Sequence, residues 1–277
     1  KQILSGNLSR LFLKKSAAGT LRMRDEDLQE LSRPKIDTHW HSDGWDILEP
    51  AKGLENISRF IDRFGYRAVC VSSITALNYD LEQGNERLLE AINKDSRLFA
   101  YIVIDPLRID QSLELLSRYA SHPKVVGLKT IQDHYDLKLD DPQYAPLLEW
   151  ASKNRFPVMA HLRGMGNAAR RFRDVQFIAA HSTLGRIHQL ADVEGKIPNN
   201  IYFDIAVSHS SRSETNLKGL AKAVGANRIL YSADGPLMSP AWTIGKVIDA
   251  GFDAATKDKI YLRNALTLLP KLESAIS

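Results

Sequence analysis

Residues 36–41 read Ile36-Asp37-Thr38-His39-Trp40-His41, a short strand-like run that ends in two histidines. Successive side chains of a strand point to opposite faces, so His39 and His41 share one face and Trp40 takes the other. Two imidazoles on one face of a strand end can chelate a divalent metal. A single His-x-His pair is more often structural than functional, so its meaning depends on the rest of the chain.

Seven further apolar or β-branched runs follow at intervals along the chain. Most are continuously hydrophobic, which is typical of strands buried on both faces of a parallel sheet. Together with the first run, the expected strands are residues 36–41, 67–72, 98–104, 125–129, 157–161, 175–181, 201–205 and 229–232.

Helical patterns separate these runs. One example begins at Pro142 and places Tyr144, Leu147, Leu148 and Ala151 at i, i+3, i+4 and i+7, the spacing of one apolar helix face. Strands that alternate with helices indicate repeated βαβ units. Eight such units in about 240 residues favour a closed (β/α)8 TIM barrel, an α/β fold, over an open sheet.

Several of the expected strands end at a single polar or ionisable residue. Lys129 ends the fourth run, His161 ends the fifth, His181 ends the sixth, and Asp234 follows the eighth. With residues 39 and 41, four of the eight histidines of the chain stand at strand ends. Barrel enzymes place their active sites at the C-terminal ends of the strands, so the pattern indicates a metal-dependent active site.

These motifs together resemble those of the amidohydrolase superfamily, most closely its branch that contains aromatic-acid decarboxylases. The resemblance spans residues 35–277. It rests on Asp37-Thr38-His39-Trp40-His41, Gly127-Leu128-Lys129, the lone His161 and His181, Tyr231-Ser232-Ala233-Asp234-Gly235-Pro236, and Arg263-Asn264-Ala265-Leu266-Thr267-Leu268-Leu269, in which Thr267 replaces the usual arginine.

The resemblance implies a set of metal ligands. His39, His41, His161 and Asp234 would surround the main ion, and His181 would bind a second ion or polarise the substrate. Lys129 would bridge two ions if carboxylated; an unmodified lysine is a poor ligand, and the sequence leaves both forms open. The expected cofactor is one or two divalent ions, zinc first, with manganese or iron also suited to mixed nitrogen and oxygen ligands.

The leading functional expectation is hydrolysis of a small amide, lactone or ester, with Asp234 as general acid/base for metal-activated water and His181 stabilising charge on oxygen. The alternative is non-oxidative decarboxylation on the same scaffold, with Asp234 delivering a proton to carbon. A metal-dependent nuclease is disfavoured by Lys129 in place of a glutamate. A non-catalytic barrel is disfavoured because every expected ligand position is filled.

Three residues near strand ends carry weaker expectations. Arg163 would face the same side as His161 and could clamp a substrate carboxylate, although a solvated loop arginine fits equally well. Asp105 and Asp204 follow the third and seventh runs, where an aspartate more often caps the next loop than contacts substrate.

Composition limits the partners. The net charge of +4 belongs to residues 1–35, with eight basic and four acidic residues, and the remainder holds 29 of each sign. The barrel therefore lacks the basic footprint of a nucleic-acid-binding protein.

No apolar run approaches the roughly 20 residues that cross a bilayer, and the single cysteine, Cys70, fits a reducing, cytoplasmic compartment. The expected partner is a small molecule, for which a carboxylate is one option, and a homo-oligomer is compatible with the sequence.

Residues 1–34 are expected to form an N-terminal extension to the barrel of residues 35–277. Residues 3–12 themselves resemble the closing helix of the family. One hypothesis is therefore that they are the tail of an upstream domain and that residues 13–34 are a linker. The alternative is a helical arm that packs on the barrel or on a neighbouring subunit.

Overall fold

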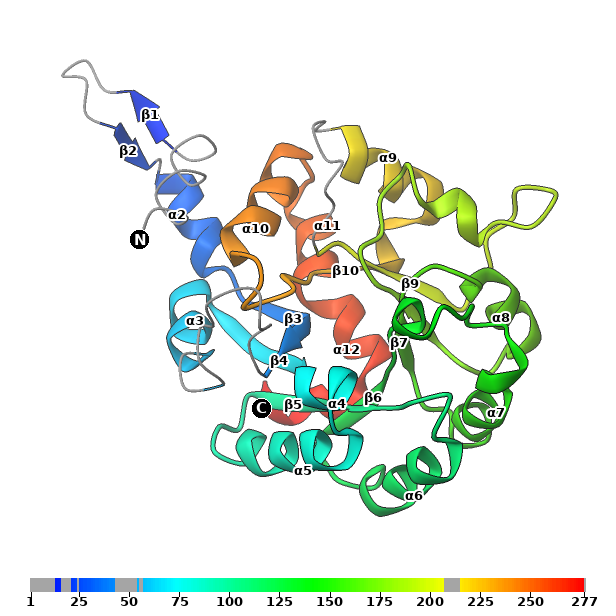
Figure 1. Cartoon of the computed structure of the whole chain (residues 1–277). Helices are drawn as coiled ribbons and strands as arrows, with labels where there is room; N and C mark the ends of the chain where they lie inside the picture. The colour runs from blue at the N-terminus through cyan, green and yellow to red at the C-terminus, as the bar shows by residue number, and fades with distance from the viewer. Residues whose placement is uncertain are drawn as a thin grey trace.

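Eight parallel strands form one sheet whose order follows the chain, and helices surround it (Figure 1). This computed structural model describes residues 13–15, 21–23, 25–42, 54, 57–206 and 215–276. The strands are β3 (Lys35–His41), β4 (Tyr66–Ser72), β5 (Leu98–Val103), β6 (Val125–Lys129), β7 (Val158–Ala160), β8 (Phe177–Ala179), β9 (Ile201–Asp204) and β10 (Ile229–Leu230). The predicted (β/α)8 barrel is confirmed, and each strand lies within two or three residues of its predicted bounds.

Apart from α2, which precedes β3 and is described below, the α-helices of the described residues lie between and after these strands. They are α3 (Ile57–Phe64), α4 (Ile74–Asn78), α5 (Leu81–Ile92), α6 (Ile109–Tyr119), α7 (Ala145–Asn154), α8 (Met165–Arg171), α9 (Thr215–Val224), α10 (Pro240–Asp249), α11 (Ala254–Asp258) and α12 (Asn264–Leu268). Helix α7 buries Leu147, Leu148 and Ala151, as the apolar spacing predicts.

The barrel is closed by the segment after β10 rather than by β10 itself, which has only two residues. The Thr38 amide donates to the Tyr231 carbonyl at 3.2 Å, and the His41 amide donates to the Gly235 carbonyl at 2.7 Å. The Asp234 amide donates to the His39 carbonyl at 2.9 Å. These bonds place Asp234 beside the two histidines of β3, so the closure of the barrel also builds the site.

Apolar side chains fill the half of the barrel at the N-terminal ends of the strands. Strand residues meet the last helical segments, which close the N-terminal end of the barrel. This cluster contains Ile36, Ala68, Cys70, Phe99, Tyr101, Val126, Met159, Ile178 and Leu230 from the strands and Ala265, Leu268, Leu269 and Leu272 from the C-terminal segments. The ionisable side chains His39, His41, Lys129 and Asp234 lie at the opposite, C-terminal ends of the strands.

The N-terminal extension is partly structured. Strands β1 (Leu13–Lys15) and β2 (Leu21–Met23) pair antiparallel, and α2 (Asp25–Ser32) leads from them to the barrel (Figure 1). The buried Lys35 Nζ donates to the carbonyls of Leu31, Arg33 and Phe64 at 2.9, 2.6 and 2.7 Å, which ties the end of α2 to the barrel. Residues 25–32 are thus helical and are joined to the barrel through Lys35. Residues 3–12 lie outside the described residues.

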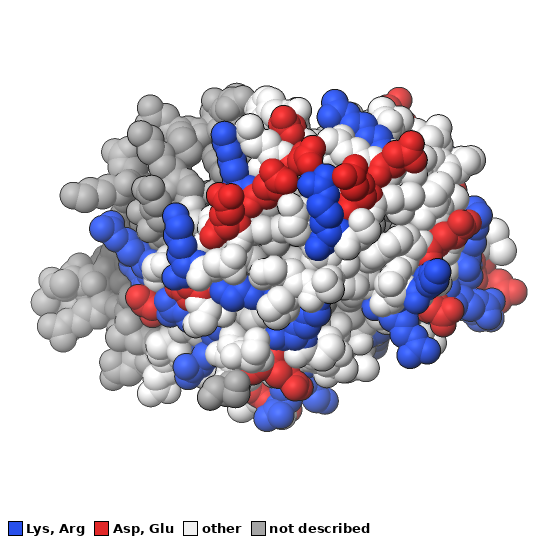
Figure 2. All heavy atoms as spheres, turned by 90° about the horizontal axis from the view of Figure 1, so that it is seen from below, with Lys and Arg blue, Asp and Glu red and all other residues white. Residues whose placement is uncertain are grey.

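The charged surface is mixed in sign. Lys and Arg side chains alternate with Asp and Glu over the face in Figure 2. Arg118, for example, contacts Glu82 and Glu114 at 2.9 and 2.8 Å. Within the described part of the chain, no helix is long and apolar enough to span a membrane.

Candidate metal centre and active site

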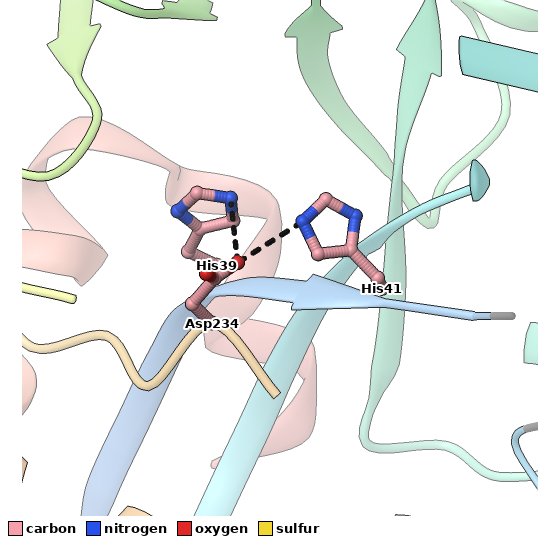
Figure 3. A group of neighbouring side chains, drawn as sticks. All are labelled: His39, His41 and Asp234. Carbon is pink, nitrogen blue, oxygen red and sulfur yellow. Dashed lines mark ion pairs between the residues drawn. The ribbon is translucent and has the colours of Figure 1, made fainter. Parts of the chain in front are cut away.

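His39, His41 and Asp234 meet at the C-terminal end of the barrel (Figure 3). Asp234 Oδ1 lies 3.5 Å from His39 Nε2 and 3.1 Å from His41 Nε2. All three side chains are nearly inaccessible to solvent. Trp40, between the two histidines, packs on the outer face of the strand against Phe60 and Tyr66, as the strand alternation predicts.

The outer nitrogen of each imidazole has its own partner. Asp204 Oδ2 lies 2.5 Å from His39 Nδ1, and Ser72 Oγ lies 3.1 Å from His41 Nδ1. Both rings therefore direct Nε2 toward Asp234. Burial is the main reason that the pKa of His41 falls to about 4, although Asp234 opposes this shift. At neutral pH this imidazole is unprotonated, the form in which histidine binds a metal.

Asp204 and Asp234 are ionised despite their burial. Burial alone would raise the pKa of both carboxyl groups, but their contacts with the imidazoles lower these pKa values by more. The pKa of Asp204 is lowered to about 2 by His39, His181 and a hydrogen bond from Ser232. His39 and His41 hold the pKa of Asp234 well below its ordinary range.

His181 lies on the other side of His39, with ring centroids 5.1 Å apart. No described residue is within hydrogen-bonding distance of its buried Nδ1. Burial lowers the pKa of His181 to about 3, so the ring is neutral. Its backbone is left-handed, with φ of 56°, as is that of Asp234 at 58°. Such strained conformations of non-glycine residues concentrate at functional sites.

His161 stands at the rim of the cluster. Its ring centroid is 5.2 Å from that of His181, and its Nδ1 lies 2.6 Å from Asp133 Oδ2. The side chain is 22% exposed. The two groups of possible ligands among the described residues, His39–His41–Asp234 and His39–His181–Asp204, do not include it. The structure thus places His161 beside the site without bringing it into contact with Asp234.

Lys129 is buried at the centre of the cluster. Its Nζ lies 2.9 Å from His39 Nε2, which the amine can donate to. Burial lowers the pKa of Lys129 to about 8, against the attraction of Asp234 and Asp204. Lys129 thus ends a strand, as predicted. Its amine contacts His39 Nε2, the same nitrogen that faces Asp234.

Arg163 lies apart from the cluster. Its guanidinium is 43% exposed and contacts Asp136 at 2.9 Å. A different arginine, the half-buried Arg186, lies closer, with Nη1 3.5 Å from the His181 carbonyl oxygen.

The ligand set fits a divalent cation by two criteria. Two imidazole nitrogens and one carboxylate oxygen are the ligand types of zinc, manganese and iron sites. An ion about 2.1 Å from each ligand holds adjacent ligand atoms about 3.0 to 3.4 Å apart. The observed separations of 3.1 and 3.5 Å from Asp234 Oδ1 to the two imidazoles match this spacing.

Sequence reasoning missed three residues that hold the histidines. Asp204 was expected to cap its loop; it accepts the Ala206 amide there and also contacts His39, and Ser72 and Asp133 carried no expectation. The position of Asp204 at a strand end was the available signal. Its partner on β3 is 165 residues away, and only the barrel brings the two together.

A parallel barrel with ionisable residues gathered at its C-terminal strand ends defines a class of enzymes with the active site at that end. Residues 36–271 match the family model described as Amidohydrolase, and the chain belongs to this family of enzymes. The expected family is thus confirmed. No curated protein matches the sequence.

Solved structures share the fold at low identity. A candidate amidohydrolase from Staphylococcus aureus is 15% identical with a TM-score of 0.69, covering 86% of this chain and 99% of that one. The 2,6-dihydroxybenzoate decarboxylase from Rhizobium is 18% identical with a TM-score of 0.66, covering 85% and 98%. The 5-carboxyvanillate decarboxylase from Novosphingobium aromaticivorans, complexed with manganese, is 14% identical with a TM-score of 0.66, covering 88% and 99%.

Proposed function

We propose that this protein is a metal-dependent, non-oxidative decarboxylase of a small aromatic acid. The observation that carries the proposal is the convergence of His39, His41 and Asp234 at the barrel end, in a family member whose similar solved structures include decarboxylases of dihydroxybenzoate and carboxyvanillate. The similar structures favour decarboxylation, the alternative in the sequence analysis, over the hydrolysis expected first.

His39 Nε2, His41 Nε2 and Asp234 would hold the divalent cation, with His161, at the rim of the cluster, as a further candidate ligand. Bound there, the cation would supply positive charge that anchors an anionic substrate and stabilises developing negative charge. Manganese, present in the complex of the Novosphingobium decarboxylase, is our first choice, and zinc and iron suit the same ligands.

Asp234 would move the proton that the reaction consumes. In a non-oxidative decarboxylation the bond between the ring carbon and the carboxylate breaks, CO2 leaves, and a proton takes its place on carbon. No electron acceptor is needed. Asp234 would take a proton from the bound acid or its hydroxyl group and deliver it to that carbon. Its left-handed backbone and the bond from its amide to His39 fix the carboxylate for this transfer.

His181 would contact the substrate. Its buried Nδ1 has no partner among the described residues, and a buried polar atom is stabilised by a hydrogen bond from a ligand. A hydroxyl group beside the carboxylate, as in dihydroxybenzoate, could donate to a neutral imidazole nitrogen. Arg163 would clamp a carboxylate only on a substrate that reaches the rim, in exchange for its contact with Asp136.

Product analysis with the manganese-loaded protein tests the proposal. A panel of hydroxybenzoic acids should include one that releases CO2 and yields the corresponding phenol, and the His39→Ala, His41→Ala double variant should release none. Turnover of lactones or amides with no CO2 release from any acid would instead support the hydrolase.

A further inference from the structure

Asp204 is a fully buried carboxylate that the proposed reaction does not use. It comes from the last residue of β9 (Ile201–Asp204), next to the strand that closes the barrel. Oδ2 contacts His39 Nδ1 at 2.5 Å. Oδ1 accepts the Ser232 hydroxyl at 2.5 Å and the Ala206 amide at 2.6 Å. Both oxygens are therefore engaged, and the carboxylate has a fixed orientation.

The short contact with His39 is a hydrogen bond and not the edge of a second metal site. Two ligands of one ion lie about 3.0 Å apart or more, because each is about 2.1 Å from the metal. At 2.5 Å, the two atoms are too close for that arrangement and suited to a charge-assisted hydrogen bond. An ionised carboxylate only accepts, so the hydrogen must belong to His39 Nδ1.

A second contact agrees with this assignment. Lys129 Nζ lies 2.9 Å from His39 Nε2, and an amine donates to an unprotonated ring nitrogen. His39 therefore carries its hydrogen on Nδ1 and keeps the lone pair of Nε2 for a ligand. Ser72 cannot impose the same choice on His41, because a hydroxyl both donates and accepts.

We infer that Asp204, oriented by Ser232 and the Ala206 amide, is the positioning residue that selects the metal-binding tautomer of His39 and thereby determines the metal affinity of the site. The inference rests on the metal centre of the proposed function. Carboxylates that orient a ligating histidine contribute about 10- to 100-fold to metal affinity in other proteins. Asp204 would act through His39 and without contact to the substrate.

Replacing Asp204 by asparagine tests this role at almost constant volume. An asparagine has one accepting oxygen and one donating NH2 group. The Ala206 amide can only donate and so requires the oxygen, which turns the NH2 group toward His39. His39 Nδ1 must then accept, so its hydrogen moves to Nε2 and blocks the ligand position. The matched control is Asp105→Asn, since Asp105 follows β5 but its side chain accepts a bond from the Leu107 amide of its own loop.

Two readouts separate this inference from the proposed function. Ring 15N NMR of the metal-free protein should show the Nδ1–H tautomer of His39 in wild type and in Asp105→Asn, and the Nε2–H tautomer in Asp204→Asn. Titration with manganese should give a dissociation constant about 10- to 100-fold higher for Asp204→Asn than for wild type or the control. An unchanged tautomer and unchanged manganese affinity in Asp204→Asn would overturn the inference.

If wild type binds no manganese or zinc, the proposed function fails, and the NMR result still decides whether Asp204 sets the tautomer. If Asp204→Asn does not fold, Ser232→Ala replaces it. This variant removes one of the two donors to Oδ1 and should weaken manganese binding several-fold. A dissociation constant equal to that of wild type would then contradict the inference.

Discussion

At the scale of single residues, the site depends on which atoms of its side chains remain available. His39 and His41 each use Nδ1 for a protein contact and turn Nε2 toward Asp234. His181 keeps a buried nitrogen that no described residue satisfies. The three histidines are thus not equivalent, and in the proposed function two of them would bind the metal and one would contact the substrate.

Asp234→Asn should lose most of the activity and leave the fold intact. The amide preserves the shape of the side chain and cannot carry the proton to carbon, so we expect kcat to fall by about 10²- to 10⁴-fold. The measurement is CO2 release under saturating substrate, with circular dichroism to check folding. A variant with more than half of the wild-type kcat would contradict the role assigned to Asp234.

His181→Gln distinguishes a substrate contact from a metal ligand. As a substrate contact, its loss should reduce kcat/KM by about 10²- to 10³-fold and leave the number of bound metal ions unchanged. The exposed His188 offers a control, since His188→Gln should match wild type in both measurements. Loss of one metal ion in His181→Gln would instead make residue 181 a ligand.

At the scale of elements, the site is built by the contact between β3 and the segment after β10. The eight predicted strands and their polar ends followed from hydrophobic runs, because a buried parallel strand has a simple sequence pattern. The role of Asp204 could not be read in the same way, since nothing local distinguishes it from Asp105. Each carboxylate accepts the amide two residues ahead, Ala206 for Asp204 and Leu107 for Asp105, and Asp204 in addition contacts His39.

Gly235→Ala should disrupt this closure. A Cβ at residue 235 would lie 2.3 Å from ring atoms of Trp40, which is packed against Phe60 and Tyr66 and has little freedom to move. We expect the free energy of unfolding to fall by about 1 to 3 kcal/mol and Asp234, the preceding residue, to shift. Urea denaturation and metal titration measure the two effects. Wild-type stability with wild-type metal affinity would contradict this account of the closure.

Asp95 lies just before β5 and contacts Arg97. This contact makes part of the free energy of unfolding depend on pH. The Asp95 carboxylate accepts from Arg97 Nε and Nη2 at 3.0 and 2.8 Å, and these bonds lower its pKa. Because the folded value lies below the unfolded one, the contribution is present above the ordinary aspartate pKa of about 4 and is lost as the pH falls through the folded value.

Asp95→Asn should therefore be less stable than wild type by about 1 kcal/mol at pH 7, since the pair is only partly buried. The difference should shrink as the pH falls below about 4. Urea denaturation at several pH values tests this dependence. A constant difference between pH 7 and pH 3 would contradict it.

At the scale of the whole molecule, one end of the barrel is apolar and closed, and the other gathers the ionisable groups. The C-terminal segments of the chain close the N-terminal end of the barrel with Leu268, Leu269 and Leu272. The barrel fold and the end that gathers the ionisable residues were predictable from the sequence, because chain length and strand spacing constrain both. The packing of α2 on the barrel was not, because it depends on Lys35 reaching carbonyls of two separate segments.

A bound ion should stabilise the whole molecule, because the ligands from β3 and from the segment after β10 meet only in the folded state. At a free metal concentration 100 times the dissociation constant, the expected gain is about 2.7 kcal/mol. Thermal denaturation before and after removal of metal by a chelator measures it. The His39→Ala, His41→Ala double variant should show no such shift.

The metal content of the purified protein tests the central claim most directly. Elemental analysis should compare wild type with the His39→Ala, His41→Ala double variant, each after incubation with manganese or zinc and removal of free ions. The account predicts about one transition-metal ion per wild-type chain and none in the variant. A wild-type protein that holds no metal and takes none up from either buffer would contradict the metal centre and the chemistry proposed for it.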